Sequence, residues 1–181
     1  GLNGSNGLNG DAYEAHVWME GDYYYVYLKN TTQNRVGKYK LHGTHALVLN
    51  AQGGDGGNGG EGGKGGTGKE GGLNGATTKL PGNGGNGGNG GHAGNGGTGG
   101  NVTVFIHSNA EAIKPSLEIR NFGGFAGSAG RGGEGGIPGK SLSGQAQGKN
   151  GLNGLNGFNG QNGQAGTVSV QTATFDPNLY Y

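Results

Sequence analysis

The sequence has no cysteine, one tryptophan and four prolines among 181 residues, and only 29% of its residues are hydrophobic. Without cysteine, disulfides are excluded. No apolar stretch approaches the roughly 20 residues of a membrane-spanning helix. The formal net charge is +1 and no basic block occurs, which argues against binding to nucleic acid or anionic membranes. We therefore expect no nucleic-acid partner, no membrane insertion, and a side-chain core built from a minority of the chain.

Glycine is abundant instead, with 50 residues, and it is periodic. Glycine recurs at every third position in five runs, numbered here in chain order: 1–10, 53–68, 82–100, 124–139 and 148–166. A flexible linker has no reason to keep such a phase. The second to fourth runs are mostly Gly-Gly-X triplets, and the first and fifth are Gly-X-Asn triplets.

A left-handed helix with three residues per turn places each position of a triplet on its own edge. A glycine edge allows another main chain to approach closely. We therefore expect the Gly-Gly-X runs, which have two bare edges, inside a bundle. The Gly-X-Asn runs, which have one, are expected at its margin.

A longer repeat contains these runs. Short apolar segments precede the second and fourth runs and follow the third and fifth, so a unit of strand, glycine run, turn, glycine run and strand occurs at 45–108 and again at 116–175. Gly53 matches Gly123, and Gly100 matches Gly166. Residues 1–19 resemble the second half of such a unit, so we expect the sequence to begin within a repeat.

Three structures are compatible with so much glycine. Disorder is one, because fixing each residue costs about 1–2 kcal/mol. A collagen triple helix is another, but it normally carries about 15–20% or more imino acid. The third is a bundle of polyglycine-II helices joined by turns at 69–81 and 140–147, in which lateral hydrogen bonds offset the entropy cost. The strict phase favours the bundle, although short Gly-X-Asn trimer segments remain an alternative.

Outside the runs, apolar and polar residues alternate as in β-strands. The segments 13–19, 23–29, 36–41 and 45–49 predict a meander within a tyrosine-rich region at 11–50. The predicted fold class is mostly irregular and β: packed polyglycine-II helices with flanking antiparallel strands and essentially no α-helix. We expect one elongated domain over 1–181.

The Gly-Gly-Asn triplets at 84–91 resemble those of polyglycine-II sandwich proteins. This family includes the adhesins at the tips of phage long tail fibres and related glycine-rich bacterial surface proteins. Springtail glycine-rich antifreeze proteins are similar too. In the phage adhesins, variable loops at the tip recognise the receptor, so the resemblance implies a binding function without assigning any residue to it.

Motifs for catalysis or cofactors are missing. Gly139-Lys140-Ser141 lacks the first glycine of a phosphate-binding loop, where Glu134 stands instead. The glycine period is not that of calcium-binding nonapeptides. The histidines, including His42 and His45, have no cysteine or carboxylate cluster to complete a metal site. We expect no enzyme activity, no cofactor and no metal.

The candidate binding feature is an aromatic segment around residues 22–29. Alternation places Tyr23, Tyr25 and Tyr27 on one strand face, and Tyr24, Val26 and Leu28 on the other, which we expect to be core. Tyrosine suits recognition of sugars or protein surfaces, although tyrosines also simply pack across strands. The candidate ligand-binding residues are Trp18, Tyr23, Tyr25, Tyr27, Lys29 and Tyr39.

These features predict a non-enzymatic adhesin or receptor-binding tip of an extracellular fibre, on a cell surface or virion. The expected partner is a cell-surface glycan or an outer-membrane protein. One alternative is a purely structural spacer or homotrimerisation module of such a fibre. The other is an ice-binding protein. That function requires a regular row of small side chains, whereas the X positions of the triplets in this sequence mix Asp, Glu, Lys and Asn.

Overall fold

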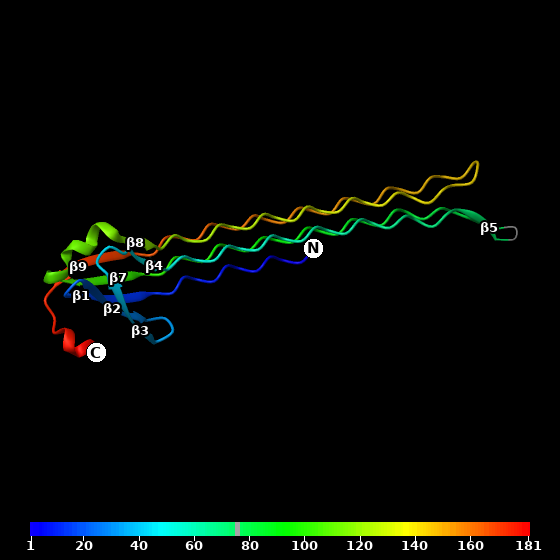
Figure 1. The fold of residues 1–181 in the computed structure, drawn as a ribbon. Helices are drawn as coiled ribbons and strands as arrows, with labels where there is room; N and C mark the ends of the chain where they lie inside the picture. The colour runs from blue at the N-terminus through cyan, green and yellow to red at the C-terminus, as the bar shows by residue number, and fades with distance from the viewer. Residues whose placement is uncertain (75–76) are drawn as a thin grey trace. The chain divides into compact units, whose positions relative to one another are not determined.

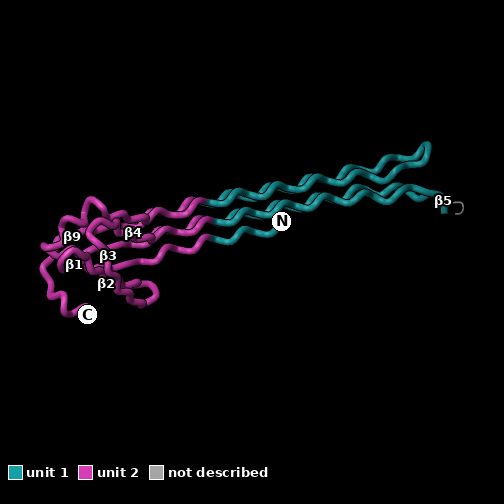
Figure 2. Tube along the Cα trace, in the orientation of Figure 1, with its two compact units in different colours: residues 1–6, 56–95, 126–161 teal, residues 7–55, 96–125, 162–181 magenta. Residues whose placement is uncertain are grey.

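The computed structural model describes residues 1–74 and 77–181, which form two compact units. Unit 1 comprises residues 1–6, 56–95 and 126–161, and unit 2 comprises residues 7–55, 96–125 and 162–181, as Figure 2 shows by colour. Both units are therefore built from segments distant in sequence. Unit 1 consists mainly of glycine runs, whereas unit 2 holds most of the strands and the side-chain core.

Unit 2 contains a five-stranded sheet with the order β3-β2-β1-β7-β9 (Figure 1). The strands are β1 (Tyr13–Glu20), β2 (Tyr23–Asn30), β3 (Arg35–His42), β7 (Val102–His107) and β9 (Val168–Ala173). The first three form the antiparallel meander that the alternation predicts. Gly21, with φ 57°, and Asn34, with φ 52°, supply the left-handed conformations that its two tight turns use.

The fourth strand expected in this meander, at 45–49, is not part of it. The observed strand β4 (Leu47–Asn50) pairs instead with β8 (Leu117–Arg120) in a separate sheet of two strands. Alternation alone identified a strand here but could not identify its partner. The partner lies 70 residues further along the chain, at the matching position of the second repeat: Leu47 pairs with Leu117.

Strands that occupy matching positions in the repeats pair with one another, and they pair in parallel. Val102 of β7 lies opposite Val168 of β9, with the offset of 66 residues that also relates Gly100 to Gly166. Strand β1, which follows the first run, pairs in parallel with the other edge of β7. The expectation of antiparallel flanking strands is therefore wrong for β4, β7, β8 and β9, because equivalent segments of a repeat run in the same direction.

The core of unit 2 lies between the two sheets. Alternate residues of β1, β2 and β7 face it, and so do Leu47, Leu49 and Ala51. The 3-10 helix η1 (Ser108–Ser116), which sequence analysis did not predict, adds Ala110 and Ile113, both completely buried. A second short 3-10 helix, η2 (Pro177–Tyr180), follows β9. Residues 1–74 and 77–181 contain no α-helix, in agreement with the mostly β fold class.

In unit 1 the glycine runs are joined side by side by main-chain hydrogen bonds. The Gly88 amide donates to the Gly63 carbonyl at 2.7 Å, the Gly133 amide to Gly88 at 2.8 Å, and the Gly154 amide to Gly133 at 2.8 Å. Each bond links a different pair of runs, and each series repeats every third residue. The peptide groups thus satisfy one another between runs rather than within them.

The number of neighbours differs between runs. Among the described residues of unit 1, the third run exchanges main-chain hydrogen bonds with all four other runs, and the second and fourth with three each. The first and fifth runs, which carry the Gly-X-Asn triplets, exchange them with two each. The Gly-Gly-X runs thus have more neighbours than the Gly-X-Asn runs, in the expected order, although the second run has no buried residue within unit 1.

Two turns connect the runs in unit 1. The turn expected at 69–81 contains β5 (Gly72–Asn74) and β6 (Thr77–Lys79), an antiparallel pair; residues 75 and 76 lie outside the described residues. The turn expected at 140–147 is observed, with Gly144 at φ 80° and a hydrogen bond of 3.0 Å from the Gln145 amide to the Leu142 carbonyl.

The close approach of the runs leaves no room for side chains at the buried glycines. A Cβ atom on Gly133 would lie 2.0 Å from the Gly63 carbonyl oxygen, far inside van der Waals contact. A Cβ atom on Gly63 itself would meet nothing within 4 Å. Glycine is therefore a steric requirement of the observed packing at Gly133 but not at Gly63.

Replacing Gly133 by alanine should lower the free energy of unfolding by at least about 2 kcal/mol, because the inserted methyl group forces two runs apart. Gly63→Ala is the matched control, and should leave stability unchanged or raise it by up to about 1 kcal/mol through the unfolded state. Denaturant unfolding of both variants checks this. Equal losses in the two would contradict the packing described.

Candidate functional site

The two faces of the five-stranded sheet differ as the alternation predicts. Tyr24 and Val26 of β2 are 3% and 1% exposed and belong to the core. Leu28 is partly buried against that core. Tyr23, Tyr25 and Tyr27 occupy the opposite face.

That opposite face is not a freely exposed ladder, because the C-terminal segment packs on it. The rings of Tyr180 and His16 stack with centroids 4.4 Å apart, and Tyr27 lies 4.9 Å from Tyr180. We call this group the aromatic cluster; it comprises His16, Trp18, Tyr25, Tyr27, Phe105, Phe175, Tyr180 and Tyr181. Tyr23, at the end of β2, is 39% exposed, while Tyr25 and Tyr27 are half-buried.

Trp18 forms the floor of the cluster. It lies opposite Tyr25 across the β1–β2 ladder, and the two rings stack at 5.8 Å with an interplanar angle of 18°. Its indole Nε1 donates to Glu20 Oε1 at 3.0 Å, and the Tyr181 hydroxyl donates to the same oxygen. Only 3% of Trp18 is exposed, so its orientation is fixed by packing and by this shared acceptor.

Lys40 lies beside the tyrosines on this face of the sheet. Its Nζ lies 4.1 Å from the centroid of the Tyr23 ring and 5.3 Å from that of Tyr25. These are cation–π distances. A hydrogen bond to Tyr25 and the nearby Glu20 raise the pKa of Lys40 above its ordinary value, although partial desolvation opposes them. The ammonium group is therefore charged at neutral pH beside the aromatic rings.

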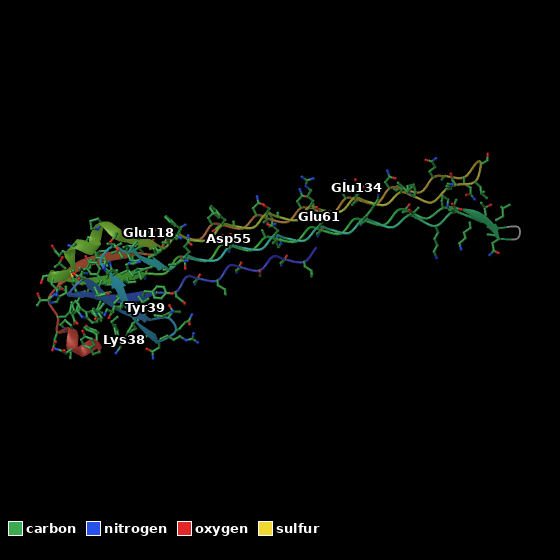
Figure 3. All side chains as sticks on the ribbon, viewed as in Figure 1. Lys38, Tyr39, Asp55, Glu61, Glu118 and Glu134 are labelled. Carbon is green, nitrogen blue, oxygen red and sulfur yellow. The ribbon has the colours of Figure 1, made fainter. Side chains whose placement is uncertain are left out.

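Two of the sequence candidates lie away from the cluster. Lys29 shares the face of Tyr27 but pairs with Glu14 near the end of β2. Tyr39 and Lys38 are adjacent on β3, so their side chains leave opposite faces of the strand. Both residues are labelled in Figure 3. The Tyr39 ring lies against Gly37, where a Cβ atom would come 2.6 Å from its hydroxyl oxygen.

A cavity of about 230 Å³ opens beside the cluster. It is lined by Trp18, Tyr25, Val26, Lys38, Tyr39, Lys40, Tyr180 and Tyr181. Of the sequence candidates, the structure thus brings Trp18, Tyr25 and Tyr39 to this cavity, together with two lysines that sequence analysis did not single out. It also adds Tyr180 and Tyr181, which are 155 and 156 residues from Tyr25. Alternation along β3 could have indicated the lysines, whereas no local pattern indicates where residues 175–181 pack.

The asparagines of the runs have a role that sequence analysis missed. Their side-chain oxygens accept main-chain N–H groups of neighbouring runs: Asn86 Oδ1 from Leu152 and Asn89 Oδ1 from Leu155, both at 2.9 Å. In unit 2, Asp55, labelled in Figure 3, accepts from the Phe125 amide at 2.7 Å. The recurrence of Asn at one position of the triplet was the available signal. These side chains therefore have a structural role, as acceptors between neighbouring runs.

Groups suited to metal binding are not found in the part of the chain that the structure describes, where no three His, Asp or Glu side chains gather. Within residues 1–74 and 77–181 there is also no helix of the length and apolarity needed to span a bilayer. The aromatic cluster and its cavity, which include the sequence candidates Trp18, Tyr25, Tyr27 and Tyr39, are the candidate site.

Comparison with known proteins gives no match: neither a family model, nor a curated protein, nor a solved structure is found to be similar to this chain.

The contact between Tyr181 and Glu20 should make the C-terminal segment sensitive to alkali. The hydrogen bond to Glu20 raises the pKa of Tyr181 above its ordinary 10.0, and burial together with Glu14 raises that of Tyr180. The neutral phenol is the donor, so its stabilising contribution is complete below pH 10 and is lost as the pH rises through the raised pKa.

We therefore expect the fluorescence of Trp18, the only tryptophan, to shift to longer wavelength above pH 10, as the ionised Tyr181 leaves Glu20 and water reaches the indole. Tyr181→Phe, which keeps the ring but cannot ionise, should shift less over the same range. An identical alkaline shift in both proteins would show that Tyr181 does not hold the segment.

Proposed function

We propose that this chain is a non-enzymatic adhesin or receptor-binding module of an extracellular fibre, and that the aromatic cluster binds a cell-surface glycan. The observation that carries the proposal is the cavity of about 230 Å³, in which aromatic rings adjoin two lysines. Aromatic side chains with polar tips supply large contact areas and hydrogen bonds at little entropic cost. A rigid sheet holds them in place.

The shape and charge of the cavity favour a particular ligand. Its volume is below the about 300–1,000 Å³ of pockets for drug-sized molecules, so we expect it to hold a single sugar unit. Lys38 and Lys40 lie opposite Tyr27 and Tyr25 on the neighbouring strand and are both exposed. Their charges suit a carboxylate, so an acidic sugar fits better than a neutral one.

The scaffold in this proposal is a bundle of polyglycine-II helices. Lateral hydrogen bonds that repeat every third residue support this assignment. So does the close packing at glycines such as Gly130 and Gly133, where a Cβ atom would lie about 2 Å from the carbonyl oxygen of a neighbouring run. An isolated polyproline-II-type helix has no internal hydrogen bonds. The runs therefore gain order only by packing together, which suits a part whose task is to display a binding surface.

A double charge reversal, Lys38→Glu with Lys40→Glu, should reduce binding to acidic glycans at least tenfold, since both cations become repulsive groups. Arg35→Glu is the matched control: it lies on the same strand, is exposed, and does not line the cavity. Binding on a glycan array, followed by titration of the best sugar, measures both. Loss of binding in the control alone would overturn the assignment to the aromatic cluster.

A structural spacer is the second candidate, and exposed apolar side chains on the fifth run favour it. Leu152, Leu155 and Phe158 occupy successive X positions and are 73%, 73% and 76% exposed. Such a row is suited to association. A blank glycan array together with a stable oligomer in sedimentation would support this function over the first.

Ice binding has less support. The exposed X positions of the fourth run in unit 1 carry Ser128, Arg131, Glu134 and Ile137, which differ in size and charge. They do not form a flat, repeated rank of small side chains. Absence of thermal hysteresis in solution would remove this alternative.

A further inference from the structure

A second and larger cavity, of about 560 Å³, opens on the other face of the five-stranded sheet. It lies on the face of Leu28, whereas Lys38 and Lys40 belong to the opposite face. No residue of β3 is buried, so the core ends at β2 and the cavity occupies the space beyond it. Strands of both sheets line it, and we call it the inter-sheet cavity. Its volume is within the range of about 300–1,000 Å³ that is typical of ligand pockets.

A row of polar side chains lines one part of this cavity. Tyr13, Asn30 and Arg35 lie opposite one another on β1, β2 and β3. The Asp11 carboxylate accepts the side-chain amides of Asn30 at 2.8 Å and of Gln33 at 2.7 Å, both at Oδ2. Among the described residues, neither the other oxygen of Asp11 nor the Arg35 guanidinium has a hydrogen-bond partner. A carboxylate that its neighbours hold in place thus keeps a free acceptor atom.

The Tyr13 hydroxyl supplies a donor near this carboxylate. Burial raises the pKa of Tyr13 above its ordinary 10.0, and Asp11 and Tyr39 raise it further. The phenol therefore keeps its proton at neutral pH and can donate it in a hydrogen bond. The inter-sheet cavity thus combines an anionic acceptor, a phenolic donor and, in Arg35, a cationic donor.

An aromatic ring adjoins the polar row. Gly37 lies opposite Leu28 and carries no side chain, which leaves room for the ring of Tyr39: a Cβ atom on Gly37 would come 2.6 Å from the Tyr39 hydroxyl oxygen. Tyr39 is nevertheless 52% exposed. One side of the ring is therefore held against the strand, while the rest of its surface is open to a ligand. From β4, Val48 and Leu49 add apolar surface to the cavity.

We propose that the inter-sheet cavity binds a neutral disaccharide unit of a glycan, with one sugar ring packed on Tyr39 and hydroxyl groups bonded to Asp11 and Arg35. Sugar hydroxyls both donate and accept, so they match a carboxylate together with a guanidinium. The apolar face of a sugar ring suits the large contact area of a tyrosine. The opposite charges of Asp11 and Arg35 leave the site without net charge, which disfavours ligands of either sign.

Size and charge distinguish this ligand from the one proposed for the aromatic cluster. The inter-sheet cavity has more than twice the volume of the cavity beside that cluster, about 560 against 230 Å³, and so has room for two sugar units rather than one. An acidic sugar would be repelled by Asp11 here, whereas it is attracted by Lys38 and Lys40 there. The inference rests on the proposed function for its ligand class, a glycan, but on different residues.

Neutral members of a glycan array, followed by NMR titration of the best of them into the full chain, test the assignment. The backbone amides of Gly37 and Val48, one from each sheet, should shift and reach saturation. Tyr39→Ala should weaken binding at least tenfold because the ring is lost. Phe125→Ala is the matched control, since it removes another exposed aromatic ring of unit 2 that lies outside the cavity, and should bind as before.

Three results would overturn the proposal: an array on which no neutral glycan binds, amide shifts confined to the surroundings of Trp18, or equal affinities of the Tyr39→Ala and Phe125→Ala proteins. In each variant the fluorescence of Trp18 should match that of the unmodified protein, which reports that unit 2 is folded.

Arg35→Glu separates the two sites. It removes the guanidinium and places a second carboxylate in the inter-sheet cavity, so affinity for the neutral glycan should fall at least tenfold, while binding of acidic glycans on the other face persists. Unchanged affinity for the neutral glycan would overturn this site alone. A protein that binds neutral but not acidic glycans, and loses the former in Arg35→Glu, would contradict the aromatic-cluster assignment and support the inter-sheet site.

Discussion

The main-chain hydrogen bond between glycine runs is the interaction on which the rest of the molecule depends. It forms because the runs carry no Cβ atom on the edges that meet, so that carbonyl oxygens lie about 2 Å from where such atoms would stand, as at Gly130 and Gly136. A single bond contributes only about 0.5–1.5 kcal/mol net. Its recurrence at every third residue, between several pairs of runs, gives glycine-rich sequence an ordered alternative to disorder.

The β-strands of unit 2 follow the same sequence repeat as the glycine runs. Residues 7–10, 96–100 and 162–166 lead into β1, β7 and β9, which are neighbours in one sheet, while β4 and β8 pair in the other. Apolar side chains fill the space between the sheets. The tyrosine-bearing strands β2 and β3 extend the first sheet beyond the repeat, and they provide the surface on which the C-terminal aromatics pack.

Much of this organisation was predictable from sequence because it is periodic. The phase of glycine indicated which runs have the most neighbours, the repeat indicated which strands correspond, and alternation separated Tyr24 from Tyr25. The expectations that were wrong or missing concern contacts between segments that are distant in sequence. The partner of β4, the parallel direction of the flanking strands and the packing of residues 175–181 on Trp18 have no local signature. The regular spacing of the asparagines in the runs could have indicated a structural role. That their side-chain oxygens accept main-chain N–H groups, however, depends on which run lies alongside.

The central claim is that glycine amides and carbonyls of different runs are bonded to each other. Scalar couplings through hydrogen bonds, measured by NMR between amide nitrogens and carbonyl carbons, test it most directly. The account predicts couplings from the Gly88 nitrogen to the Gly63 carbonyl carbon and from Gly133 to Gly88. Glycine amides that show no such coupling and exchange with solvent as fast as those of an unfolded peptide would contradict it.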